Sequence, residues 1–392
     1  MIYIYKEMSV ATMSKLDLIA TAPMGLEAIV ARELKELGYT DTVTENGRVN
    51  FKGEAVDIAR ANLWLRTAGR ILVNMGRFKA TTFDELFEGV KALNWDEWIP
   101  ADAEFPVNGR SHKSQLTSVP AVQGVVKKAI VEKLKEKHGT EWFPEEGPRY
   151  VIEITLLNDE ALLTIDTSGS GLHKRGYRKA ATEAPLRETM ASAIVQLSRW
   201  KPDRPLYDPF CGSGTILIEA AMLGWNIAPG LRRSFDAEQW QLVPEALWDE
   251  ARDEAYDAVK DDVPLQITGS DIDPNAIEIA QEAVRRAGLG KEIKLHVAPV
   301  SKIKPQGDYG VVITNPPYGE RLGDDKEAEL ALRQLGKVSL YYPTWSYFIF
   351  SPSASVEHYM SKVADKKRKL YNGRIQCNLH SFFGPLPPRN MS

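Results

Sequence analysis

The first part of the chain alternates between strand-like and helix-like patterns of hydrophobic and polar positions. Apolar residues at every second position predict strands, and apolar residues spaced three and four apart predict helices. The predicted elements are a strand at 16–22, a helix at 26–37, a strand near 48–51, a helix at 55–65 and a strand at 70–79. We interpret this rhythm as β-α-β-β-α-β, which is typical of a ferredoxin-like module, here over residues 15–78.

A second module is predicted over residues 79–170. Its elements are a helix at 83–92, a strand around 104–107, a helix at 119–137 and paired strands at 150–157 and 160–166. Its basic residues form either a solvated helix face or a face that contacts RNA, and the pattern favours neither. These residues are Arg110, His112, Lys113, Lys127, Lys128, Lys133 and Lys135.

The alternation of apolar and polar residues ends at Gly169-Ser170-Gly171, and a basic stretch follows at residues 172–179. Taken alone, such a stretch is more often a charged loop than a binding element. An amphipathic helix is predicted at 185–200, and a new strand begins after it. We therefore expect a linker and helix at residues 171–200 and a separate domain at residues 201–385.

The C-terminal domain alternates strand and helix. Strands are predicted at 206–208, 265–271, 293–297 and 311–314, and helices at 215–223 and 274–287. Such alternation predicts an α/β fold with a doubly wound, mostly parallel sheet. Residues 229–263, rich in acids and Trp, are expected to be helical and to cover part of this sheet. Residues 341–350 predict the end of a late helix followed by a buried strand, and Asn372-Gly373 predicts a turn between two late strands.

One strand end carries unusual chemistry. The strand at 311–314 ends in Asn315-Pro316-Pro317-Tyr318, and neither proline has an N–H to continue the sheet. Ligands of open α/β sheets bind at the carboxyl ends of strands. An amide, an acceptor-only carbonyl at Pro316 and an aromatic ring predict a pocket for a flat, amino-bearing group. In isolation, however, an Asn-Pro pair more often marks a simple turn.

A glycine loop at residues 208–215 lies between a predicted strand and a predicted helix. Gly212 and Gly214 let the backbone approach a ligand, and the helix N-terminus favours a carboxylate or phosphate. The Walker lysine and the third glycine of the dinucleotide fingerprint are both missing. Cys211 in this loop is expected to be a packing residue rather than a nucleophile.

Two aspartates follow the next strand. Asp271 stands where Rossmann-like sheets place a carboxylate that binds ribose hydroxyls. Asp273 is instead expected to cap the helix that begins at Pro274. The glycine loop, Asp271 and the Asn-Pro-Pro-Tyr strand end together favour a nucleoside ligand with a charged tail.

Composition and charge narrow the setting. The 392 residues are 43% hydrophobic, enough for two or three domains with their own cores. The formal charge is −4, so any surface for nucleic acid must be local. Two cysteines are too few for a disulfide framework, which favours a cytoplasmic protein. No set of Cys and His residues has the spacing of a zinc site, so no metal is predicted. No signal or membrane segment is expected, and residues 1–14 are expected to be a disordered extension.

Three motifs together resemble those of class I S-adenosylmethionine-dependent amino-methyltransferases. They are residues 208–215, Asp271-Ile272-Asp273 and Asn315-Pro316-Pro317-Tyr318. Flanking stretches resemble the THUMP-domain RNA methyltransferases of the RlmL-like group, and this resemblance runs from about residue 16 to the end of the chain. The flanking stretches are residues 171–178, 184–189, 319–323 and 366–373.

The resemblance implies a Rossmann-like methyltransferase domain preceded by an α+β ferredoxin-like plus THUMP region that binds RNA. It also implies S-adenosylmethionine as cofactor and methylation of guanine N2, in bacteria usually in 23S rRNA, by a single catalytic domain. The implied cofactor-binding residues are Asp208, Phe210, Gly212, Gly214, Thr215, Asp271, Ile272 and Asn315. The implied catalytic residues are Asn315, Pro316, Pro317 and Tyr318. The candidate RNA contacts are His173, Arg175, Arg178, Lys366, Arg368 and Lys369.

Several alternatives stay open from the sequence. Residues 297–301 lack the acid that this family often places near the adenine, so the adenine contacts are not assigned. The Asn-Pro-Pro-Tyr motif alone does not choose the base, and guanine N2 in tRNA or adenine N6 in DNA are competing targets. A catalytically silent, RNA-binding ribosome assembly factor is the non-enzyme alternative. The sequence favours neither a monomer nor a dimer.

Overall fold

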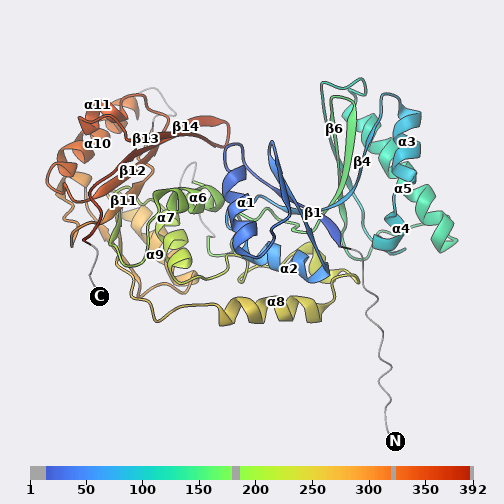
Figure 1. Cartoon of the computed structure of the whole chain (residues 1–392), viewed down its shortest axis with the longest axis horizontal. Coiled ribbons are helices and arrows are strands. Elements are labelled where there is room, and N and C mark those ends of the chain that lie inside the picture. The colour runs from blue at the N-terminus through green and yellow to red at the C-terminus, as the bar shows by residue number, and fades with distance from the viewer. Residues whose placement is uncertain (1–14, 179–185, 319–323, 389–392) are drawn as a thin grey trace, which may run out of the picture.

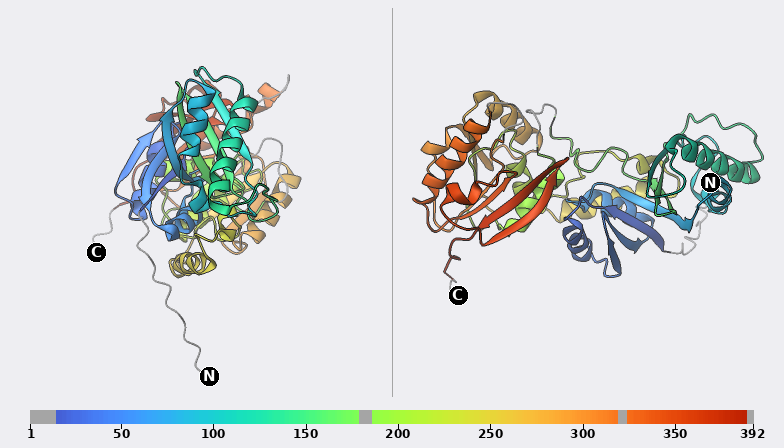
Figure 2. Two further views of the ribbon diagram at one scale, coloured as in Figure 1. Left: turned by 90° about the vertical axis from the view of Figure 1, so that its right-hand side faces the viewer. Right: turned by 90° about the horizontal axis from the view of Figure 1, so that it is seen from above.

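The computed structural model describes residues 15–178, 186–318 and 324–388. Within these ranges the chain forms two seven-stranded sheets. The two sheets lie toward opposite ends of an elongated molecule, as Figure 1 and the view from above in Figure 2 show. The expected extension at residues 1–14 and the motif at residues 319–323 lie outside the described residues.

The first sheet has the strand order β2-β3-β1-β4-β7-β6-β5. Its strands are β1 (Leu16–Thr21), β2 (Thr42–Glu45), β3 (Arg48–Gly53), β4 (Ile71–Lys79), β5 (Val107–His112), β6 (Val151–Leu157) and β7 (Glu160–Asp166). The β-α-β-β-α-β order is confirmed, and β2 is the strand that the pattern did not locate. Because β4 pairs antiparallel with both β1 and β7, the two N-terminal modules share one continuous sheet.

Helices cover one face of this sheet. They are α1 (Glu27–Glu36), α2 (Ala55–Trp64), α3 (Phe83–Lys91), α4 (Trp95–Trp98) and α5 (Val119–His138). Leu18 and Ala20 on β1 point into the core that these helices share. Side chains alternate along a strand, so Ile19 points to the opposite face. There it forms a small separate cluster with Leu72 and Leu162.

The strand predicted around residues 104–107 is wrong in its position. The ladder with β6 runs from Val107 to His112, whereas Glu104 makes one isolated bridge to Arg149. Pro106 lacks the N–H that a continuous ladder needs, which explains why pairing starts after it. The true strand contains Asn108, Arg110 and His112, and such polar residues hide a strand from a hydrophobic pattern.

The second sheet has the order β10-β9-β8-β11-β12-β14-β13. Its strands are β8 (Leu206–Asp208), β9 (Ile267–Asp271), β10 (Ile293–Val297), β11 (Val311–Thr314), β12 (Ser346–Ser351), β13 (Lys366–Asn372) and β14 (Ile375–Phe382). The five strands from β10 to β12 run parallel, and β14 and β13 add an antiparallel hairpin. The strand order reverses between β8 and β11, and such a switch point places a ligand crevice at the carboxyl ends of these strands.

Helices flank the second sheet. They are α6 (Glu188–Ser198), α7 (Thr215–Gly224), α9 (Pro274–Arg286), α10 (Asp324–Ser339) and α11 (Val356–Met360), with a short 3-10 turn η2 (Val300–Lys302). The predicted α/β class is confirmed in both its parallel strands and its flanking helices. Within the described residues, no helix combines the length and the apolar composition of a membrane span.

The insertion at residues 229–263 is helical as predicted, but its predicted packing partner is wrong. It contains η1 (Asp236–Gln239) and α8 (Glu245–Asp257), and α8 packs against α2 rather than on the second sheet (Figure 1). Trp240 stacks on Tyr150 with 4.4 Å between ring centroids. Arg60 Nε lies 2.6 Å from Glu254 Oε2. The insertion therefore ties the C-terminal domain to the N-terminal region.

Candidate active site

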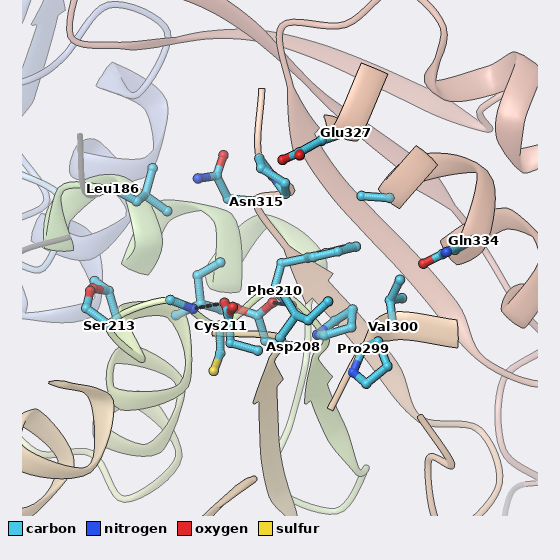
Figure 3. Close-up of a pocket in the computed structure, with 18 of the residues that line it drawn as sticks. Leu186, Asp208, Phe210, Cys211, Ser213, Pro299, Val300, Asn315, Glu327 and Gln334 are labelled. Carbon is cyan, nitrogen blue, oxygen red and sulfur yellow. Dashed lines mark hydrogen bonds between the residues drawn. The ribbon is translucent and has the colours of Figure 1, made fainter. Parts of the chain in front are cut away.

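A cavity of about 670 Å³ opens where β8, β9 and β11 end (Figure 3). Most of the predicted site residues line it, namely Asp208, Phe210, Gly212, Thr215, Asp271, Ile272, Asn315 and Pro317. Gly214, Pro316 and Tyr318 are not among the lining residues. Three motifs that are far apart in the sequence therefore meet at one cavity, as the switch point requires.

The glycine loop has a backbone conformation that requires its glycines. Gly212 and Gly214 have φ values of 49° and 75°, in the left-handed region that favours glycine. The Gly212 N–H donates to Asp271 Oδ2 across 3.0 Å. A Cβ at Gly214 would lie 3.3 Å from the Ala280 Cβ, so this position also allows close packing against α9. The loop then enters α7 at Thr215, whose N-terminal end faces the cavity.

Asp208 is a buried carboxylate that connects two strands. Its Oδ1 accepts hydrogen bonds from the Thr314 hydroxyl at 2.6 Å and from the Phe210 N–H at 3.1 Å. Burial raises the pKa of Asp208 to about 7, and these two hydrogen bonds oppose the increase. Asp208 thus fixes the shape of the glycine loop, whereas its direct contact with a cofactor stays a prediction.

Asp271 ends β9 with its carboxylate held by backbone groups. Oδ2 accepts from Gly212, and Oδ1 accepts from the Asp273 N–H at 3.1 Å. An ionised carboxylate has about four lone-pair sites, so acceptor capacity remains for a ligand with hydroxyl groups. Asp273 instead accepts from the Asn275 N–H at 2.9 Å, which confirms it as the N-cap of α9. Ile272 between them is 71% exposed at the rim of the cavity.

Asn315 presents a polar atom that has no partner within the described residues. Its side-chain Oδ1 is buried and accepts no hydrogen bond there. A buried acceptor left without a donor costs about 1–3 kcal/mol, so a donor from a ligand would be strongly favoured. Figure 3 shows the amide facing the same space as Phe210 and Leu186. The atom expected to receive an amine hydrogen is therefore available in the cavity.

The remaining motif residues frame this amide. Pro316 is buried and Pro317 is exposed at the cavity wall. The Tyr318 hydroxyl accepts a hydrogen bond from Asn372 Nδ2 across 2.8 Å. Asn372 belongs to the turn predicted between the two late strands, so the C-terminal hairpin orients the tyrosine.

Cys211 behaves as expected for a packing residue. Its side chain belongs to the core cluster beneath the sheet end, and 5% of the residue is exposed. Burial raises the pKa of the thiol, and the nearby Asp208 and Asp271 raise it further. A thiol held in its neutral form is a poor nucleophile.

Sequence reasoning missed one wall of the cavity. Glu327, Leu330 and Gln334 of α10 line it, and the sequence indicated only the end of a late helix near residue 341, without these positions. Their spacing of three and four residues places them on one helix face, which was the available signal. Pro299 and Val300 also line the cavity. The stretch that lacks the expected acid thus supplies apolar contacts.

Arg175 was predicted to contact RNA, and the structure contradicts this. The residue is 2% exposed, and its Nε lies 3.5 Å from Glu219 Oε1. Its guanidinium also donates to the carbonyls of Leu172 and Arg66. A charged linker residue can be recruited as an internal ion pair, and sequence alone does not separate the two roles.

The structure does not gather the other predicted RNA contacts into one cluster. Arg178 pairs with Glu188 at 2.6 Å, and Arg368 donates to the Gly25 carbonyl at 2.6 Å. Lys366 and Lys369 are exposed on β13. Burial, followed by the charges of neighbouring cations, lowers the pKa of His173 to about 4. RNA binding by these residues stays a prediction.

Comparisons with known families match three consecutive parts of the chain. The family "RlmL ferredoxin-like domain" matches residues 17–72, and "THUMP domain" matches residues 80–166. The family "RMKL-like, methyltransferase domain" matches residues 175–381, more than half of the chain.

Known proteins resemble the whole chain. "Putative RNA methyltransferase YpsC" of Bacillus subtilis (strain 168) is 49% identical over 379 residues, covering 96% of this chain and 98% of that protein. A structure from Listeria monocytogenes, described as a "predicted N6-adenine-specific DNA methylase", is 50% identical with a TM-score of 0.92, covering 95% of this chain and 97% of its own. "SMU.472, a putative methyltransferase complexed with SAH" is 46% identical with a TM-score of 0.91, covering 95% and 99%.

These matches confirm the predicted family and fold class. The methyltransferase family match and the related structure solved with SAH confirm S-adenosylmethionine as the cofactor. They leave the target base and the kind of RNA open. The ferredoxin-like domain, the THUMP domain and the methyltransferase domain occur along the chain in the predicted order. The chain belongs to the RlmL-like family of THUMP-domain RNA methyltransferases.

Proposed function

We propose that this protein methylates the exocyclic N2 amine of a guanine in 23S rRNA, with S-adenosylmethionine as methyl donor. The observation that supports an amine target most directly is the buried Asn315 Oδ1, which accepts no hydrogen bond from the described residues. An exocyclic amine carries two N–H donors, so one of them would satisfy this acceptor. The preference for guanine N2 comes from the family resemblance, and the four motif residues do not require it.

The residues of the cavity fit the cofactor. The two oxygens of Asp271 suit ribose hydroxyls, and the N-terminus of α7 at Thr215 suits the carboxylate of the methionine part. Ile272, Pro299 and Val300 offer apolar contact to a flat ring. When bound, S-adenosylmethionine supplies an electrophilic methyl group on a sulfonium centre.

Asn315 would make the amine reactive. The lone pair of an exocyclic amine is delocalised into the base, which makes the amine a poor nucleophile. Oδ1 of Asn315 and the carbonyl of Pro316 would each accept one amine hydrogen and hold the nitrogen so that its lone pair points at the methyl group. A nitrogen–carbon bond forms as the carbon–sulfur bond breaks, and the methylated amine then loses a proton to solvent. No strong general base is needed.

Tyr318 and Pro317 would position the base. Because Asn372 holds the Tyr318 hydroxyl, the ring has a defined direction for stacking. Stacking of a base on an aromatic side chain contributes about 1–3 kcal/mol. Pro317 stiffens the corner at the cavity wall, so positioning would supply much of the rate. In duplex RNA the target edge is paired, so the base must be unpaired or flipped.

Support for RNA comes from the N-terminal half. Residues 80–166 match the THUMP domain, and the Bacillus relative bears an RNA methyltransferase name. The Listeria structure bears the name of an adenine-N6 DNA methylase, and that activity is the second candidate because Asn-Pro-Pro-Tyr suits either amine. A direct comparison of substrates decides between them.

Two measurements test the proposal. In a filter assay with radiolabelled S-adenosylmethionine, we expect label in rRNA and none in tRNA or duplex DNA. Mass spectrometry of nucleosides should show that a deletion strain lacks one N2-methylguanosine of 23S rRNA and regains it when the gene is restored. Label in DNA alone, or an unchanged set of rRNA nucleosides, would contradict the proposal. Absence of transfer to any nucleic acid would favour the catalytically silent assembly factor.

A further inference from the structure

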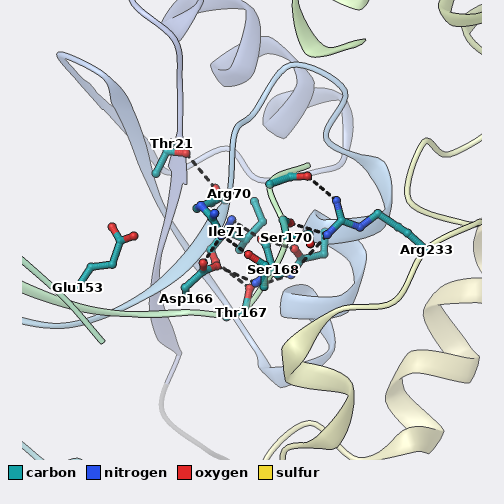
Figure 4. Close-up of polar contacts among 12 residues, drawn as sticks. Thr21, Arg70, Ile71, Glu153, Asp166, Thr167, Ser168, Ser170 and Arg233 are labelled. Carbon is teal, nitrogen blue, oxygen red and sulfur yellow. Dashed lines mark hydrogen bonds and ion pairs between the residues drawn. The ribbon is translucent and has the colours of Figure 1, made fainter. Parts of the chain in front are cut away.

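A second cavity lies on the face of the first sheet opposite to its main helical core. It has a volume of about 540 Å³ and includes Ile19, Leu72 and Leu162, the small cluster of that face. Figure 4 shows Thr21, Arg70 and Glu153 around this part of the sheet. We call this cavity the sheet groove. It is separate from the cavity at Asn315, with which it shares no lining residue.

The sheet groove is lined by groups that bind phosphate and ribose. Four arginines line it against a single glutamate, although the whole chain has a formal charge of −4. Hydroxyl groups come from Thr21, Thr155 and Thr164. Arginine forks and hydroxyl donors are the side chains that most often contact nucleic-acid phosphates. The arginines are Arg48, Arg70, Arg110 and Arg187.

One end of the groove is fixed by internal arginine contacts. Arg70 pairs with Asp166 and donates to the Gly169 carbonyl. Gly169 belongs to the loop at residues 168–171. Arg233 donates to the carbonyls of Ser168 and Gly171 in this loop, at 3.1 and 2.7 Å (Figure 4). These bonds use Nη1 of Arg70 and both terminal nitrogens of Arg233 to hold the loop. This end of the groove is thus supported by internal contacts, and more exposed cations for a ligand lie elsewhere.

Arg110 and Arg187 are the cations most available to a ligand. The Arg110 side chain is 75% exposed, although its Nη2 lies 3.1 Å from Glu153 Oε2. An exposed pair of this kind contributes little and can exchange partners. Arg187 is exposed and lines the groove. Both side chains can therefore meet a phosphate without losing a buried interaction.

The groove and the catalytic cavity adjoin at one peptide bond. Leu186 lines the cavity that contains Asn315, and the next residue, Arg187, lines the sheet groove. Consecutive Cα atoms are about 3.8 Å apart. A phosphate held by Arg187 would consequently lie within one arginine side chain's length of the cavity wall at Leu186. Arg187 also precedes the first residue of α6, so its backbone position is fixed by a buried helix.

We propose that the sheet groove holds the backbone of the RNA strand next to the target nucleotide, a proposal that rests on the function proposed above. Arg110 and Arg187 contact phosphates, and the threonine hydroxyls face phosphate or ribose. The strand crosses the open face of the first sheet and reaches the catalytic cavity at Leu186. The N-terminal region thereby sets the path of the RNA, and the base is delivered to Asn315.

The test is RNA binding by a double variant, Arg110→Gln with Arg187→Gln. Phosphate contacts are independent of sequence, so fluorescein-labelled oligouridine is a suitable probe for fluorescence anisotropy. We expect affinity to fall at least about tenfold. The slope of log affinity against log salt should become less steep by about 1.4, roughly 0.7 for each lost phosphate contact with a single strand.

The matched control is the double variant Lys291→Gln with Lys294→Gln. Both lysines are exposed, and they flank the start of β10, at the end of the parallel strands opposite to the catalytic cavity. This control removes the same charge and should keep wild-type affinity and slope. Unchanged binding by the groove variant, or an equal loss in the control, would overturn the proposal.

Photocrosslinking keeps the test decisive if the variant is unstable. Oligouridine with 4-thiouridine, bound to the wild-type protein, should crosslink to the lining of the groove, on β1, β4, β5, β6 or β7 or at residues 171–173 and 187, when the products are mapped by mass spectrometry. Crosslinks confined to other elements would refute the groove.

The two proposals fail in different ways. If the protein methylates no RNA, the oligouridine assay still reports on Arg110 and Arg187. If the groove alone is wrong, the double variant methylates its RNA as well as the wild type does.

Discussion

The Thr314 hydroxyl donates a hydrogen bond to Asp208 Oδ1 across 2.6 Å and joins the last residues of β11 and β8. β11 leads into Asn315, and β8 leads into the glycine loop. The two strands are neighbours in the sheet, and both residues are buried. The strand that presents the substrate acceptor and the strand that presents the cofactor loop are therefore held in one register.

The pH dependence of stability should report on Asp208. Its pKa is raised by burial to about 7 in the folded protein from an ordinary value of 3.8, so the folded state binds the proton more tightly. The stability from this group is fully present below about pH 4 and is lost as pH rises through 7. Between pH 5 and 7, the free energy of unfolding of the wild type should fall relative to Asp208→Asn, by at most about 1.4 kcal/mol per pH unit. Urea unfolding of both proteins measures this difference, and parallel profiles would contradict it.

Asp271→Ala should weaken binding of S-adenosylmethionine. A hydrogen bond to a charged group contributes about 1.5–3 kcal/mol, so affinity should fall roughly tenfold or more. Titration calorimetry measures the effect. The control is Asp273→Ala, which removes the N-cap of α9 at a cost of about 1 kcal/mol in stability. This control should leave cofactor affinity unchanged, and equal affinities in all three proteins would refute the role of Asp271.

Arg175→Ala should destabilise the protein without a specific effect on RNA contacts. Removing one partner of a buried ion pair leaves Glu219 uncompensated, which typically costs about 3–5 kcal/mol. Lys174→Ala is the neighbouring control, because Lys174 is exposed. Thermal and urea unfolding should separate the two variants. If Arg175→Ala unfolds like the wild type but binds RNA with a reduced salt slope, its original assignment as an RNA contact would stand.

The chemistry of the site could be predicted because it lies in short local motifs. The left-handed glycines at 212 and 214, the cap at Asp273 and the proline stop after Thr314 each follow from the conformational limits of one or two residues. Strand alternation then indicated a parallel sheet, whose switch point brings the motifs together.

Packing partners could not be predicted in the same way. The composition of the insertion indicates that Trp240 and Trp248 pack against a core, but it does not say which core they enter, and they enter the N-terminal one. The burial of Arg175 depends on Glu219, which is 44 residues away. The wall formed by α10 was missed because its cavity-facing positions mix polar residues, such as Glu327 and Gln334, with apolar ones, such as Leu330.

Asn315→Ala tests the central claim most directly, since it removes the unpartnered acceptor and leaves the cofactor loop intact. Transfer of labelled methyl groups to rRNA should fall by about 100-fold or more, as expected for a group that acts in the transition state. Titration calorimetry should show S-adenosylmethionine bound with near wild-type affinity. If Asn315→Ala methylates rRNA at the wild-type rate while binding the cofactor normally, the role assigned to Asn315 is wrong.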